Sequence, residues 1–115
     1  MKLTQLQYFM CISECGSFTK AAEQLHITQP SLSKAIAELE VEAGTTLLLR
    51  TKSGVQLTQE GQIVLEQVRN ILRETDELSE MFRQNAASIS HIKNWNTSDY
   101  GAIALFRRLW EEFPL

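Results

Sequence analysis

The sequence predicts a mainly α fold made of three short helices, a small β-hairpin and one long helix. Three observations favour it. Apolar residues recur at helical spacing in three segments before residue 44, two short apolar runs flank a basic stretch, and apolar positions spaced by four and three follow residue 58. With 115 residues, of which 43% are hydrophobic, the chain has the length of one compact domain or a little more.

The first two helices are predicted before residue 26. The first covers about residues 3–14, where apolar side chains fall at helical spacing, and Gly16 ends it as a left-handed cap. Ser17 then offers a side-chain oxygen to the N-terminus of the second helix. The stripe that the second helix buries is expected to be Phe18, Ala21, Ala22 and Leu25.

A third helix is predicted from about residue 29 to residue 43, where Gly44 stops it. Its N-cap is Thr28, whose hydroxyl is expected to accept the N–H of Ser31, because Pro30 has no N–H to donate. The inward residues are expected to be Leu32, Ile36, Leu39 and Ala43.

The opposite face of the third helix is predicted to be exposed. Helical geometry places Pro30, Lys34 and Ala37 on it, with Ser33 on its flank, and allows Lys34 to pair with Glu38. This face is small and polar and has a single cation, so it can enter a groove that bulky or acidic side chains could not.

A β-hairpin is predicted after the third helix. Residues 47–49 and 55–57 are short apolar runs, and the residues between them contain Arg50, Thr51, Lys52 and Gly54. The hairpin therefore has a basic tip at residues 50–54, with Gly54 as the glycine that its turn requires.

The long helix is predicted to begin after Thr58 and to extend to about residue 84, a length of roughly 39 Å at 1.5 Å per residue. Its apolar positions alternate in steps of four and three, as in a coiled-coil seam. The residues of this seam are Val64, Val68, Ile71, Thr75, Leu78 and Phe82. A small domain cannot cover the apolar seam of a helix this long, so we expect a second long helix to pack against it.

The last part of the sequence reads as a linker followed by a short segment with aromatic residues. Residues 85–88 are expected to break the helix, residues 89–95 to form a short strand, and residues 102–113 to form an amphipathic helix. The segment 88–115 is too short to form a core of its own.

The net charge of −3 initially argues against nucleic acid as a partner. Up to Thr58, however, five basic residues balance five acidic ones, and the excess of acid lies entirely in the rest of the chain. The local charge therefore leaves DNA binding open.

Several other functions are disfavoured. Cys11 and Cys15 are neighbours on one helix, which suits a reducing compartment, and neither His26 nor His91 completes a zinc spacing. Residues 17–20 and 31–34 fit the S-x-x-K pattern of acyl enzymes, but no S-D-N or K-T-G follows. No apolar run is long enough for a membrane span, and no secretory signal is visible. We therefore expect no enzyme activity, no cofactor, no metal, and a cytoplasmic protein.

A series of motifs runs through the first 61 residues in a fixed order. They are residues 6–9, 16–22 and 25–34, then Ile36, Leu39, Glu40, Gly44, Leu47, Arg50, Gly54, Leu57, Thr58 and Gly61. In this order and spacing the first 58 residues closely resemble the N-terminal domain of the LysR-type transcriptional regulators. The resemblance continues through the long helix to about Gln84.

This resemblance implies a winged helix-turn-helix DNA-binding domain (1–58), a linker and dimerisation helix (59–87) and the opening of an effector-binding domain (88–115). The third helix would enter the major groove and the hairpin, as the wing, the minor groove. The DNA-binding residues carried over are Ser17, Thr19, Lys20, Thr28, Gln29, Pro30, Ser31, Ser33, Lys34, Arg50, Thr51 and Lys52. The seam of the long helix would form the dimer.

The expected function is a dimeric, sequence-specific transcription regulator that binds double-stranded DNA at an inverted repeat, as a homodimer or higher oligomer. Because the chain stops where the family's effector-binding domain begins, we expect it to be truncated. An alternative is an interaction protein that forms heterodimers with full-length relatives through its linker helix and titrates them.

Overall fold

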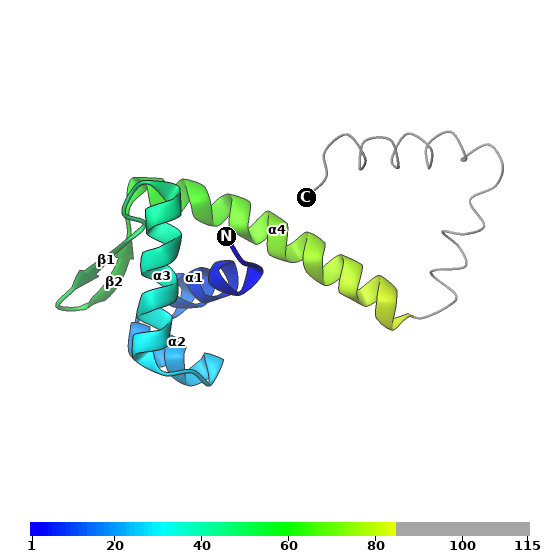
Figure 1. The fold of residues 1–115 in the computed structure, drawn as a ribbon, viewed down its shortest axis with the longest axis horizontal. Helices are drawn as coiled ribbons and strands as arrows, with labels where there is room; N and C mark the ends of the chain where they lie inside the picture. The colour runs from blue at the N-terminus through cyan, green and yellow to red at the C-terminus, as the bar shows by residue number, and fades with distance from the viewer. Residues whose placement is uncertain (85–115) are drawn as a thin grey trace. The chain divides into compact units, whose positions relative to one another are not determined.

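The computed structural model of the chain describes residues 1–84. In chain order the elements are α1 (Leu3–Cys15), α2 (Phe18–Leu25), α3 (Gln29–Ala43), β1 (Leu48–Thr51), β2 (Gly54–Leu57) and α4 (Gln59–Arg83) (Figure 1). The chain divides into two units, residues 1–75 and 76–115. The predicted mainly α fold with one small hairpin and a long helix is confirmed. The strand and helix expected within 88–115 lie outside the described residues.

The boundaries of the three short helices follow from local capping. Gly16 and Gly44 take left-handed conformations, with φ of 67° and 73°, and end α1 and α3. The Ser17 side chain accepts the N–H of Lys20 and the Thr28 side chain accepts the N–H of Ser31, as predicted for the starts of α2 and α3. The sequence therefore specifies these helix ends through single residues.

One core joins the three helices to the hairpin and to the first part of α4. Its most enclosed large side chains are Leu6, Phe9, Ile12, Leu32, Leu47 and Val68. Most of the predicted stripes are buried, although Leu25 is only half-buried. Ala43, predicted to face inward, is exposed, because it lies one turn beyond Leu39, the last buried residue of α3.

The wing is an antiparallel hairpin with a tighter tip than the sequence predicts. Leu48 pairs with Leu57, Arg50 with Val55, and Thr51 with Gly54, which leaves Lys52 and Ser53 as the turn. Arg50 and Thr51 therefore belong to β1 and not to the tip. Burial in β1 ends after Leu48, and the strand continues through polar residues to Thr51, so the change from apolar to polar side chains does not mark the end of the strand.

Gly54 is required both by its backbone conformation at the end of the turn and by a close approach. Its φ is 136°, and a Cβ at this position would lie 2.5 Å from the carbonyl oxygen of Gly16. The N–H of Val55 donates to the same carbonyl at 3.0 Å. The end of α1 thus anchors the wing, a role of Gly54 that the sequence did not predict.

The first part of α4 packs into the core of the domain. Thr58 caps the helix, since its hydroxyl accepts the N–H of Gly61 at 2.9 Å and donates to the carbonyl of Thr46 at 2.7 Å. The buried positions are Gly61, Leu65, Val68 and Leu72. Val68 is only 2% exposed, so this member of the predicted seam already packs within the core of its own domain. An apolar spacing of four and three does not say whether a helix buries its stripe within its own domain or against a partner.

Candidate nucleic-acid interface

The first turn of α3 presents exposed polar side chains, of which only some are used by the fold. The Thr28 hydroxyl accepts the N–H of Ser31 at 3.2 Å and donates to the Ser31 hydroxyl oxygen at 2.7 Å. Gln29 and Pro30 are exposed, and within residues 1–84 the Gln29 amide has no hydrogen-bond partner. Gln29 is therefore available to an external ligand, whereas Thr28 and Ser31 hold the turn together.

Lys34 is also exposed on α3. Its expected ion pair with Glu38 does not form within the described part of the chain, and the Glu38 carboxylate instead accepts a hydrogen bond from the Gln5 amide of α1 at 3.2 Å. The Lys34 ammonium is thus left facing solvent and can attract an anion.

The two other acids of α3 have partners at its C-terminal end. Glu40 Oε2 accepts the backbone N–H groups of Leu47 at 2.6 Å and Leu48 at 3.2 Å. Glu42 Oε2 lies 2.9 Å from the N-terminal ammonium of Met1. Negative charge on α3 is therefore concentrated in its second half and partly neutralised there, while the first turn has no acid.

The start of α2 supplies a second set of polar groups. The Ser17 oxygen accepts the N–H of Lys20 at 3.2 Å, so it serves as the N-cap of this helix. Thr19 and Lys20 are exposed. A helix N-terminus with an adjacent lysine favours an anion such as a phosphate.

Arg50 connects the wing to both helices. Its Nη2 donates to the Ser33 hydroxyl of α3 at 2.6 Å, and its guanidinium carbon lies 3.8 Å from the centre of the Phe18 ring of α2. The guanidinium is thus fixed beside the first turns of α2 and α3 by a hydrogen bond and a cation–π contact. Arg50, expected at the wing tip, therefore lies within β1 instead.

The wing tip itself consists of Lys52 and Ser53. Lys52 is exposed, and the Thr51 hydroxyl donates to the carbonyl of Gly54 at 3.1 Å, which stiffens the turn. Of the three wing residues predicted to contact DNA, Lys52 alone projects from the turn.

A second surface is apolar and lies along α4. A groove of about 410 Å³ is lined by residues of α1, α3 and α4, including Leu6, Leu39, Ile63, Val64 and Ile71. Ile63 is 61% exposed. The predicted seam did not include Ile63, because it neighbours Val64 in the sequence and the spacing pattern selects only one of them.

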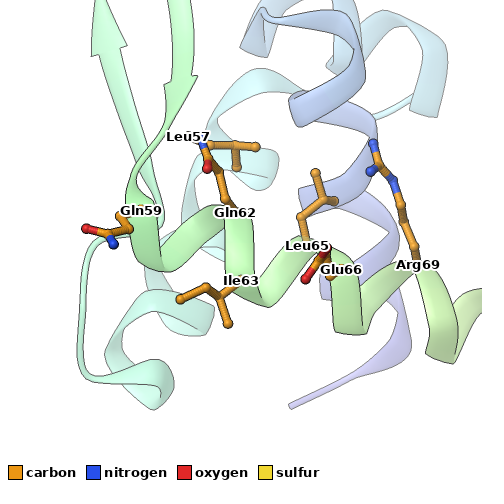
Figure 2. Close-up of a pocket in the computed structure, with 7 residues that line it drawn as sticks. All are labelled: Leu57, Gln59, Gln62, Ile63, Leu65, Glu66 and Arg69. Atoms are coloured by element: carbon orange, nitrogen blue, oxygen red, sulfur yellow. The ribbon is translucent and has the colours of Figure 1, made fainter.

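A larger hollow of about 540 Å³ lies at the start of α4 and involves the end of β2. Its lining residues are Leu57, Gln59, Gln62, Ile63, Leu65, Glu66 and Arg69 (Figure 2). Leu65 and Arg69 project to the same side of α4, whereas Ile63 projects to the other side (Figure 2). Ile63 also lines the apolar groove, so the two hollows meet at this residue.

The remaining seam residues differ in exposure. Val64, Ile71 and Thr75 are half-buried, and the Thr75 hydroxyl donates to the carbonyl of Ile71 at 2.8 Å. In the second unit, Leu78 is 50% and Phe82 63% exposed. Apart from Val68, the seam therefore retains apolar surface outside the core.

Residues 3–62 match the family model described as "Bacterial regulatory helix-turn-helix protein, lysR family". This match covers more than half of the chain and includes α1, α2, α3 and the wing. The chain belongs to the LysR family. The predicted resemblance to this family is therefore confirmed.

Curated relatives of this LysR-family chain are transcription regulators. The nitrogen assimilation regulatory protein nac of Klebsiella aerogenes is 48% identical over 77 residues, which are 67% of this chain and 25% of that protein. The hydrogen peroxide-inducible genes activator of Pectobacterium carotovorum subsp. carotovorum is 40% identical over 90 residues, 78% of this chain and 30% of that protein. The LysR-family chain thus spans about a quarter to a third of their length.

Solved structures of LysR-family proteins share the fold. The BenM DNA-binding domain in complex with catB site 1 DNA has a TM-score of 0.71 and 40% identity, covering 75% of this chain and 97% of that one. The LysR-family regulator CbnR has a TM-score of 0.70 and 35% identity, covering 75% of this chain and 30% of that one. Within residues 1–84, none of the helices has the length and apolar character that crossing a membrane requires.

Proposed function

We propose that the chain is a sequence-specific transcription regulator that binds double-stranded DNA as a dimer, with α3 in the major groove and the wing in the minor groove. One observation carries this proposal: the first turn of α3 is exposed and free of acids, presents an unpartnered Gln29, and is followed by an exposed Lys34. The BenM and CbnR domains that resemble this chain have been solved in complex with DNA, which supports the proposal.

The proposed roles follow from the chemistry of each group. Gln29 can pair with the N6 and N7 edge of an adenine, and Ser31 can contact either partner of a base pair. The N-termini of α2 and α3 direct N–H groups at phosphates, with Lys20 and Lys34 adding positive charge. Lys52 at the wing tip would reach the narrow minor groove, while Arg50 would hold a phosphate beside Ser33.

The dimer would form along α4, with a second copy of the chain as the partner. Ile63, Val64 and Ile71 border an apolar groove, and Leu78 and Phe82 are exposed further along the helix. Two recognition helices related by a twofold axis would enter successive major grooves about 34 Å apart, so the operator would be an inverted repeat. In this proposal residues 1–58 form the DNA-binding domain, residues 59–87 the linker and dimerisation helix, and residues 88–115 the opening of an effector-binding domain.

Selection of bound sites from random DNA by the full chain tests this function. We expect enrichment of an inverted repeat whose half-sites are separated by about one helical turn. Enrichment of single, unpaired half-sites would refute the dimer, and an unenriched pool would refute sequence-specific binding.

A second candidate function uses the same α4 surface for a different purpose. A relative's linker helix could cover Leu78 and Phe82, whose exposure favours some helix–helix contact. The chain would then form heterodimers and titrate a full-length relative from its operator. Mixing the two proteins in a gel-shift assay separates the candidates, since titration predicts loss of the relative's complex.

A further inference from the structure

Two thiols of α1 and one amide oxygen of α2 come together outside the residues assigned to DNA or dimer contacts. Cys11 Sγ and Cys15 Sγ are 3.9 Å apart. Gln24 Oε1 lies 3.6 Å from the first sulfur and 3.3 Å from the second. Both thiols are free and half-buried, and a spacing of four residues places them on one face of the helix.

The dimensions of this triangle match those of a metal site. Two thiolates bound to one tetrahedral ion at about 2.3 Å each lie roughly 3.8 Å apart, close to the observed separation of the sulfurs. An ion seated over the triangle can therefore contact both sulfurs and the Gln24 oxygen. Its remaining position would face solvent, because the thiols are only half-buried.

We propose that Cys11, Cys15 and Gln24 bind one soft, thiophilic metal cation, with the two sulfurs as strong ligands and the amide oxygen as a weaker third one. Binding converts two thiols and the cation into a metal dithiolate and releases two protons. Within residues 1–84 no three His, Cys, Asp or Glu side chains form a metal cluster, and the third donor here is an amide, which sequence spacing does not single out.

Other cations fit the surroundings less well. Hard cations such as Mg²⁺ prefer oxygen ligands, and sulfur is the main donor here.

The location gives the ion a structural consequence. The sulfurs belong to α1 and the oxygen to α2, so a bound cation links the two helices. Because a ligand that binds only the folded chain stabilises it, the melting temperature should rise with the concentration of the cation. This readout does not involve DNA, so the proposal can fail or succeed independently of the proposed regulatory function.

Titration of the full chain with Cd²⁺ tests the site. The chain has only two cysteines, so ultraviolet sulfur-to-cadmium charge-transfer absorption reports this pair alone. We expect one Cd²⁺ per chain, no competition by Mg²⁺, and a loss of the absorption in Cys11→Ala and Cys15→Ala. Gln24→Ala should weaken binding roughly tenfold, while Gln62→Ala, which removes an exposed amide on α4, should leave it unchanged.

Three results would overturn the proposal. The first is an equal affinity for Cd²⁺ in concentrated urea, which would mean that any unfolded C-x-x-x-C segment suffices. The second is a stoichiometry of one ion per two chains, which would mean that the cation bridges molecules. The third is an unchanged affinity in Gln24→Ala. Circular dichroism checks that the variants are folded, and Cys11→Ser and Cys15→Ser provide a second pair if the alanine variants are not.

Discussion

At the scale of single residues, the polar side chains of the proposed DNA face divide into two groups. Ser17, Thr28 and Ser31 are occupied in helix caps, and Ser33 accepts a hydrogen bond from Arg50. Gln29, Lys20, Lys34 and Lys52 are exposed. Direct base recognition should therefore depend most on Gln29, since the lysines suit phosphates better than bases.

Replacement of Gln29 by alanine should relax base preference at one position of each half-site. The loss of a two-hydrogen-bond contact to adenine costs about 1–3 kcal/mol of discrimination, with a smaller effect on non-specific binding. Site selection with Gln29→Ala measures this change, and Gln7→Ala serves as the control. An unchanged preference at every position would show that α3 docks differently.

Arg50 should be sensitive even to replacement by lysine. Lysine keeps the charge but cannot reproduce the planar guanidinium that stacks on Phe18 and donates to Ser33. We expect Arg50→Lys to weaken operator binding nearly as much as Arg50→Ala, with little change in base preference, as measured by equilibrium titration. Full binding by Arg50→Lys would mean that the charge alone matters.

At the scale of elements, the sequence predicted what depends on local chemistry. The caps at Ser17, Thr28, Gly16 and Gly44 lie where the sequence placed them, because each is determined by one residue and its nearest neighbours. The role of Gly54 could not be predicted, since it depends on Gly16, which is far away in the sequence. The same holds for Glu40, whose carboxylate joins α3 to the start of the wing.

The close approach at Gly54 should make it much less replaceable than another glycine of positive φ. A Cβ at Gly54 would meet the Gly16 carbonyl at 2.5 Å, whereas a Cβ at Gly44 would meet nothing within 4 Å. Gly44→Ala should cost about 1–2 kcal/mol for its left-handed conformation alone. Gly54→Ala should cost more than Gly44→Ala, as measured by urea unfolding, and equal losses would contradict the proposed anchor.

At the scale of the whole molecule, the chain must use α4 both for its own core and for a proposed partner. The seam pattern alone did not separate these uses, because Val68 and Leu78 both belong to it. Burial separates them, since Val68 is 2% and Leu78 50% exposed. The sequence therefore predicted the helix and its apolar character, but not which residues remain for a partner.

Two aspartate substitutions should distinguish these uses of α4. Val68→Asp places a charge in the core and should unfold the domain, whereas Leu78→Asp should leave the fold intact and weaken the dimer. Circular dichroism measures the first effect and sedimentation the second. A folded Leu78→Asp variant that sediments like the wild type would remove Leu78 from the dimer.

The charge distribution of the molecule leads to a prediction about salt. The proposed DNA face has four cations per protomer, Lys20, Lys34, Arg50 and Lys52, although the whole chain has a net charge of −3. If all of them contact phosphate, a dimer should show a slope of log K against log salt of about −7 at most, from roughly −0.9 per contact. A monomer should show about half of that slope.

The contribution of the wing tip to this slope can be measured separately. Lys52→Ala removes one contact from each protomer, so it should make the slope of the dimer shallower by about 2. Lys2→Ala removes an exposed cation outside the proposed face and should leave the slope unchanged. Titrations at several salt concentrations compare the two variants. Equal slopes would show that the wing tip does not contact DNA, because the net charge of the chain changes equally in both.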